Sequence, residues 1–103
     1  MLDHSREAVA MVRGRTRRNI EEDRLLQLAV TRLLSIIGEA SNRVSAEGRA
    51  LAAGIPWQDM ATTNNRIMRD DFSIDCDNVW QILNAELPPV IVALERALPG
   101  HVS

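Results

Sequence analysis

Residues 23–44 read DRLLQLAVTRLLSIIGEASNRV, and this stretch decides the fold. Its apolar residues recur every three or four positions, which places them on one face of an α-helix: Leu26, Val30, Leu33, Ile37, Ala40 and Val44. Four more apolar residues widen this face beyond what one neighbouring helix covers: Leu25, Ala29, Leu34 and Ile36. The stretch therefore predicts a core helix with two or more packing partners.

Gly38 lies inside this predicted helix. A glycine there costs about 1 kcal/mol relative to alanine, because its backbone loses more freedom when the helix forms. We expect close packing against another helix at Gly38 to offset that cost.

The segments before this helix are shorter. Apolar spacing from Leu2 to Val12 predicts a first helix, which Gly14 ends. Residues 13–18 include four arginines and are predicted to form a solvated basic connector. Three acidic residues then precede the core helix, where negative charge favours a helix N-terminus.

The segments after it include two further helices. Residues 45–54 predict a turn or short helical piece, and Pro56 suits the start of a helix over residues 55–75. Ser73 or Asp75 is placed to begin the last helix. Its predicted buried stripe is Val79, Leu83, Leu87, Val90, Leu94 and Leu98. Pro88 and Pro89 lack an amide donor, so a kink or break is expected near Leu87.

No strand alternation, hairpin dipeptide or internal repeat is present in the sequence. The fold class is therefore all-α, and the architecture is an up-and-down bundle of four main helices, with residues 1–103 as one domain. The broad apolar face of the core helix also favours a homodimer.

Composition excludes several classes of protein. The chain is 46% hydrophobic and 25% charged, as in soluble domains, and no apolar run approaches the roughly 20 residues that span a membrane. The mixed charges of residues 1–7 do not fit a secretory signal, so a cytoplasmic location is expected. The net charge of −2 argues against a surface that binds nucleic acid throughout.

Metal and cofactor chemistry is not indicated. Cys76 is the only cysteine, which rules out a disulfide within the chain and a cysteine-based metal site. His4 and His101 lie near opposite ends of the sequence, and neither is given a catalytic role. We therefore predict no metal and no cofactor.

A polar cluster on the helix predicted over residues 55–75 is the candidate site. Asn65, Arg66 and Arg69 are candidates for binding an RNA phosphate, since Arg66 and Arg69 would lie one helical turn apart. Asp70 and Asp71 flank Arg69 and would neutralise part of its charge. A structural ion-pair cluster at a helix end is the competing interpretation.

Several blocks of the sequence resemble the HepT-like group of the HEPN superfamily. They are the segment DRLLQLA at 23–29, LSIIGEA at 34–40, IPW at 55–57, VW at 79–80 and LPP at 87–89. The resemblance implies a homodimeric helical bundle that acts as the toxin of a toxin–antitoxin module. It also implies metal-independent endoribonuclease activity and an antitoxin partner, the nucleotidyltransferase MntA.

The family's catalytic motif is Arg, four residues, His, one residue and Tyr. Aligned without gaps from Ile55, it falls on Asn64, Arg69 and Asp71, so all three catalytic positions are substituted. Asn64 brings no positive charge to a phosphate, and Arg69 cannot exchange a proton near neutral pH. Asp71 lacks the phenolic hydroxyl that the partner adenylylates in the family.

Three functional hypotheses follow. The first is a HepT-like toxin component that is impaired in RNA cleavage but keeps dimerisation and antitoxin binding. The second is an active endoribonuclease that uses Arg66, Arg69 and Asp71 in altered roles. The third is a regulatory decoy subunit that forms mixed dimers with an active paralogue.

Overall fold

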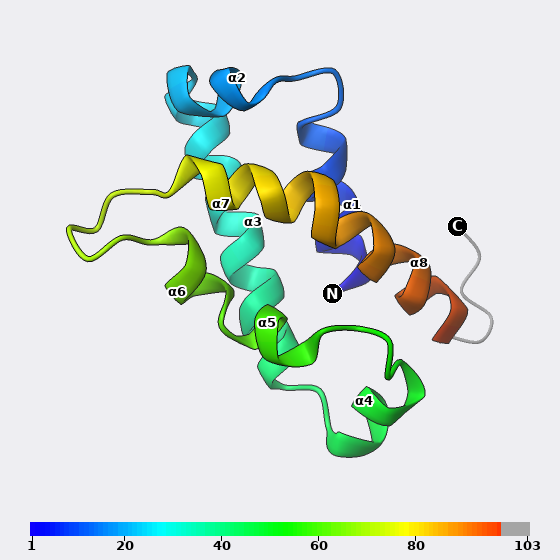
Figure 1. Ribbon diagram of the computed structural model, residues 1–103. Helices are drawn as coiled ribbons and strands as arrows, with labels where there is room; N and C mark the ends of the chain where they lie inside the picture. The colour runs from blue at the N-terminus through cyan, green and yellow to red at the C-terminus, as the bar shows by residue number, and fades with distance from the viewer. Residues whose placement is uncertain (98–103) are drawn as a thin grey trace.

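The computed structural model describes residues 1–97, and within them the only strand-like pairing is one isolated antiparallel bridge between Met68 and Ile74. The remainder is helices and loops, which confirms the all-α prediction. Helix α3 (Arg24–Asn42) runs through the middle of the molecule, and α1, α2, α5, α6 and α7 all contact it (Figure 1). The prediction that the core helix packs against two or more partners is therefore confirmed.

The N-terminal part contains one helix more than predicted. Helix α1 (Leu2–Met11) matches the prediction, and Gly14 follows it with a φ of 76°, a left-handed value that suits glycine. The expected connector over residues 13–18 is wrong at its end, because Arg17 starts α2 (Arg17–Glu22). Thr16 and Asn19 cap this helix reciprocally, each side chain accepting a bond from the other's backbone amide.

Helix α3 starts where its sequence predicts. Asp23 caps it by accepting a hydrogen bond from the Leu26 amide at 3.1 Å. A Cβ atom added to Gly38 would lie 3.3 Å from the Met60 carbonyl oxygen and 3.3 Å from the Thr63 Cβ. The close approach predicted at Gly38 is therefore confirmed, and it sets α3 directly against α5 (Trp57–Ala61) and α6 (Thr63–Ile67).

The single helix predicted over residues 55–75 is wrong. After the short α4 (Ala46–Leu51), the segment forms α5, breaks at Thr62, forms α6 and ends its helical part at Ile67. The Thr62 and Thr63 hydroxyls donate to carbonyls of α5, which competes with continued helix. Met68 is then extended, with φ of −109° and ψ of 131°.

The last helical run starts as predicted but does not break. Asp75 caps α7 (Cys76–Gln81), which continues through the π-helical turn η1 (Ile82–Glu86) into α8 (Leu87–Ala97), and Figure 1 shows one unbroken but curved helical run. Because Pro88 and Pro89 cannot donate to the preceding turn, the helix widens there instead, and the Leu87 amide bonds the Ile82 carbonyl.

The helices enclose one apolar core. Its most deeply buried side chains come from nearly every helix: Ile20, Val30, Leu34, Ile37, Met60, Ile67, Val79, Ile82, Leu83, Leu87 and Val90. The predicted buried position Leu98 lies outside the described residues. Across residues 1–97, the structure contains no helix of the length and apolarity needed to cross a membrane.

Candidate functional site

Asn64 and Asn65 lie on α6 and are both exposed. The Asn64 Oδ1 accepts a 2.6 Å hydrogen bond from the Ser35 Oγ of α3. Asn64 is therefore tied to the core helix and leaves its amide nitrogen for other contacts. Its side chain is neutral, at the position that the sequence resemblance assigns to the motif arginine.

Arg66 is occupied by an internal ion pair. Its Nη1 and Nη2 donate to the two carboxylate oxygens of Glu86, at 2.8 and 2.5 Å, and the side chains are only 27% and 20% exposed. This bidentate contact raises the pKa of Arg66. Because both terminal nitrogens already donate to a carboxylate, Arg66 in this conformation cannot form a bidentate contact with a phosphate through them.

Arg69 lies beyond the helix that carries Arg66, so the expected position one turn along the same helix is wrong. Its backbone amide donates to the Ser73 carbonyl at 2.8 Å, and its carbonyl accepts the Phe72 amide at 2.9 Å. Its guanidinium is exposed and 3.8 Å from the Asp75 carboxylate, with no bond to Asp70. Arg69 is thus the available cation of the motif region.

Asp71 is fixed within the same turn. Its Oδ1 accepts hydrogen bonds from the Ser73 hydroxyl at 2.6 Å and from the Ser73 amide at 3.0 Å. These bonds, with a smaller contribution from the Arg69 charge, lower the pKa of Asp71. Asp71 is therefore an ionised acceptor at neutral pH and a weak base.

Phe72 forms the tip of this turn. It is 84% exposed, and its φ of 63° is the only positive value at a non-glycine residue within the described part of the chain. The Met68–Ile74 bridge and the Asp75 amide, which donates to the Ile67 carbonyl at 2.7 Å, close the loop below it. The phenyl ring is therefore held outward on a braced support.

Two open clefts meet at this turn. The larger, of about 670 Å³, lies between the turn and helices α2, α3 and α7, and the smaller, of about 560 Å³, is lined by Asn64 and Asn65. Met68, Arg69 and Phe72 line both clefts and so form their shared wall. Arg69 and Asp71 are brought together in the larger cleft, whereas Asn64 lies in the smaller one.

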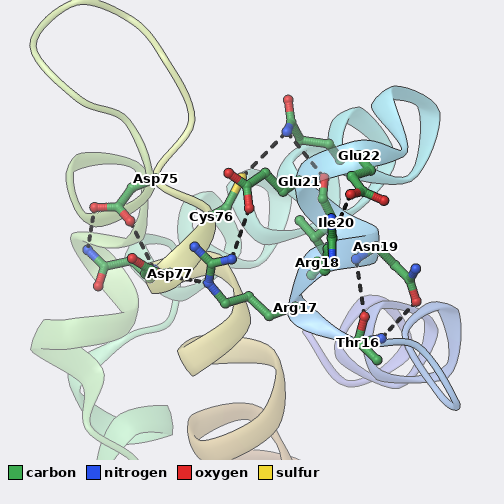
Figure 2. Close-up of polar contacts among 12 residues, drawn as sticks. Thr16, Arg17, Arg18, Asn19, Ile20, Glu21, Glu22, Asp75, Cys76 and Asp77 are labelled. Carbon is green, nitrogen blue, oxygen red and sulfur yellow. Dashed lines mark hydrogen bonds and ion pairs between the residues drawn. The ribbon is translucent and has the colours of Figure 1, made fainter.

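The rim of the larger cleft is built by ion pairs between α2 and α7. Figure 2 shows Arg17 between Glu21 of its own helix, at 3.0 Å, and Asp77 at the start of α7. Both carboxylates raise the pKa of Arg17, with the Asp77 hydrogen bond the larger cause. Behind them, the Gln27 amide donates to the Ile20 carbonyl at 3.2 Å.

Arg69 gives these clefts a cation that can bind a phosphate, but neither cleft contains a histidine from residues 1–97 to carry a proton. His4, the one histidine within residues 1–97, lies on α1 and lines neither cleft, and His101 lies outside the described residues. Across residues 1–97 no three His, Cys, Asp or Glu side chains gather to hold a metal ion. Arg69 can bind a phosphate oxygen, but it cannot exchange a proton near neutral pH.

Two contacts of the site are not foreseen from the sequence. Glu86 is the partner of Arg66, although it sits in a run otherwise read as a buried apolar stripe. The sequence offers one indication of this contact, the negative charge of Glu86, because a carboxylate next to the buried Leu87 needs a cation as its partner. The second contact, from Ser35 to Asn64, joins residues 29 positions apart and leaves no pattern in the sequence.

Among protein-family models, one described as "Ribonuclease HepT-like" matches residues 1–97. Among curated proteins, the chain is 32% identical over 99 residues to "Probable ribonuclease HepT" of Thermococcus cleftensis. That alignment covers 92% of this chain and 90% of the relative.

Two other relatives are more distant or longer. A protein of Methanocaldococcus jannaschii named "Gamma-glutamylcyclotransferase and putative RNase" is 30% identical over 91 residues, covering 84% of this chain and 41% of that protein. A "Putative RNase" of Caldanaerobacter subterraneus is 26% identical over 80 residues, which is 78% of this chain and 71% of the relative. No solved structure gives a significant match.

Proposed function

The chain belongs to the HepT-like ribonuclease family. From this membership we propose that it is a HepT-like toxin component, cytoplasmic and impaired in RNA cleavage, that keeps the dimer and antitoxin contacts of its family. The observation that carries the proposal is the set of residues at the three motif positions, Asn64, Arg69 and Asp71.

Each substitution removes one chemical role. Asn64 is neutral and engaged with Ser35, so it does not stabilise charge that develops on a phosphate. Arg69 stays protonated and cannot move a proton to or from a ribose hydroxyl or a leaving oxygen. Asp71 is an ionised acceptor held by Ser73, and it has no phenolic oxygen to be adenylylated.

The residues that would replace the missing groups are also engaged. Arg66 is the second arginine that the sequence offers in the motif region, but Glu86 holds both of its terminal nitrogens. General acid–base catalysis contributes typically about 10²–10⁴-fold to a rate. We therefore expect RNA cleavage at least about 100-fold slower than in a relative with the whole motif.

The partners proposed are a second copy of the chain and an MntA-like nucleotidyltransferase antitoxin. Binding surfaces depend on packing, and the apolar core beneath them is continuous from α1 to α8. The three motif positions are exposed, on α6 and on the turn after it, so their replacement leaves that core unchanged. Co-expression with the product of the neighbouring gene, if that gene encodes an MntA-like nucleotidyltransferase, should give a stoichiometric complex, and failure to co-purify would contradict this part of the proposal.

The decisive experiment compares the purified chain with a restored variant carrying Asn64→Arg, Arg69→His and Asp71→Tyr. The wild type should leave a labelled single-stranded RNA intact under conditions in which the restored variant cleaves it. Val92→Leu in the restored background serves as a control, because Val92 is an exposed apolar residue of α8 that lines neither cleft. Cleavage by the wild type that is lost on Arg69→Ala would overturn the proposal.

Wild-type cleavage that depends on Arg69 would instead support the second candidate, an active ribonuclease that uses Arg66, Arg69 and Asp71 in altered roles. One observation favours it: Arg69 and Asp71, a cation and a weak base, line the same cleft. Asp71→Asn distinguishes the two candidates further, because it removes the base while leaving the phosphate-binding cation. Under our proposal, Asp71→Asn changes the RNA-binding affinity little and does not lower the already slow cleavage further.

A further inference from the structure

We propose that Phe72 of one copy of this chain inserts into the larger cleft of a second copy, while the partner's Phe72 fills the cleft of the first. The cleft that contains Arg69 and Asp71 is then completed by a residue from the other chain. This inference rests on the homodimer in the proposed function, and it adds the face and the anchor residue.

The first observation is how Phe72 is presented. A large apolar side chain that is 84% exposed, on a residue with φ of 63°, combines two unfavourable features in one position. Backbone strain of this kind persists where the surroundings enforce it, and it concentrates at binding and switch sites. Here the Met68–Ile74 bridge and the bond from the Phe72 amide to the Arg69 carbonyl enforce it.

A braced ring loses little freedom on binding. Ordering a side chain at an interface costs about 0.5–1.5 kcal/mol, and fixing a loop costs more. The turn under Phe72 is already closed by several backbone hydrogen bonds in the single chain. Binding therefore adds little further cost in conformational entropy for ordering the turn. Phe72 is therefore suited to act as an interface anchor.

The second observation is the surface beside the ring. The larger cleft has apolar lining from Leu28, Met68 and Ile74, and Leu28 and Met68 remain exposed. Leu25 lies one turn before Leu28 on α3 and is also exposed. The projecting ring and the apolar lining that can receive it thus belong to the same region of one chain.

A two-fold contact between identical chains requires this self-complementarity, because each surface must supply both the projection and the recess. The balanced charge of the larger cleft also suits a second copy of the chain as the partner. Three arginines and three carboxylates line the cleft: Arg17, Arg24, Arg69, Glu21, Asp71 and Asp77. A nucleic-acid partner would instead favour an excess of positive charge, so a second copy fits this cleft better than RNA.

The test measures the dimer dissociation constant by sedimentation of the full chain over a range of concentrations. Phe72→Asp and Leu28→Asp should each weaken the dimer by at least about 30-fold, the scale of losing an interface anchor and burying a charge. Val92→Asp is the matched control, since Val92 on α8 is 47% exposed against 46% for Leu28 and lines neither cleft. It should change the constant less than about threefold.

A crosslinking measurement keeps the inference testable if an aspartate variant folds poorly. A photoreactive benzoylphenylalanine at position 72, in a mixture of isotope-labelled and unlabelled chains, should crosslink to α3 of the other copy. Crosslinks confined to the same chain would overturn the inference. The inference would also be overturned if Phe72→Asp and Leu28→Asp both left the dimer dissociation constant of the wild type unchanged. The proposed dimer itself would then still stand. A monomeric wild type in which Phe72→Asp weakens binding of single-stranded RNA would overturn both the inference and the proposed dimer.

Discussion

Breaking the ion pair between Arg66 and Glu86 tests whether Arg66 is a structural clamp or a residue free to bind RNA. The pair joins α6 to the π-helical turn, with two hydrogen bonds at 2.8 and 2.5 Å between side chains that are 27% and 20% exposed. Exposed ion pairs contribute about 0.2–1 kcal/mol, and hydrogen bonds to charged groups contribute about 1.5–3 kcal/mol. For this mostly buried, bidentate pair we expect a coupling energy of about 1.5–3 kcal/mol.

A double-mutant cycle measures that coupling directly. Urea unfolding of the wild type, Arg66→Met, Glu86→Gln and the double variant gives four free energies of unfolding, whose combination isolates the pairwise term. Each single variant should be clearly destabilised, because it leaves the other charge without its partner. The double variant should lose less than the sum of the two single losses.

The same cycle on Arg18 and Glu22 is the control. That pair is one helical turn apart on α2, with side chains 81% and 59% exposed, and solvent screens it. Its coupling should stay near 0.3–0.5 kcal/mol, roughly the value of exposed helical pairs. If the Arg66–Glu86 coupling is no larger than this, Arg66 is not clamped, and the reasoning that excludes it from phosphate binding fails.

Two further predictions concern packing and pH. Gly38→Val should lower the free energy of unfolding by about 1–3 kcal/mol, because its Cβ would press on the Met60 carbonyl oxygen, whereas Gly54→Val, in open space, should change it much less. Asp71 has a lowered pKa in the folded chain, so its ionised form stabilises the fold above the usual Asp range, and this contribution is lost as the pH falls through the folded pKa. Wild type should therefore be more stable than Asp71→Asn at neutral pH, with the difference vanishing in acid. A difference that persists in acid would contradict the ionic explanation.

The sequence predicts the core helix well because its signals agree. Apolar spacing and the acidic residues before the helix point to the same element, and the close packing expected at Gly38 is present in the structure. The cap at Asp75 is equally local, since it depends on a side chain and an amide three residues on. Such features are read from short stretches without knowledge of the rest of the chain.

The segment from Ile55 to Asp75 is predicted poorly because its outcome depends on competition. Thr62 and Thr63 bond back to α5 carbonyls, and Met68 pairs with Ile74 instead of continuing the helix. Helical spacing alone places Arg66 and Arg69 side by side, but a helix that ends at Ile67 separates them. The candidate residues are therefore identified from the sequence, whereas their relative geometry is not.

Partners distant in the sequence are the other limit. Glu86 is 20 positions from Arg66 and Asp77 is 60 positions from Arg17, and no local pattern connects either pair. The proline pair is an intermediate case. Pro88 and Pro89 correctly locate a disturbance in the helix, but whether it becomes a break or a wider turn depends on the packing around Leu87.

Helix α2 has a thermodynamic consequence for the larger cleft. Six residues are too few for a helix to persist alone in water, so α2 depends on the buried Ile20, its caps and the ion pairs of Arg17. Those pairs are exposed, and added salt weakens them. Local unfolding of α2 should therefore need less free energy than global unfolding, and amide hydrogen exchange over residues 17–22 should speed up with ionic strength. Since Arg17 and Glu21 line the cleft, we expect the α2 side of its wall to open more often at higher ionic strength.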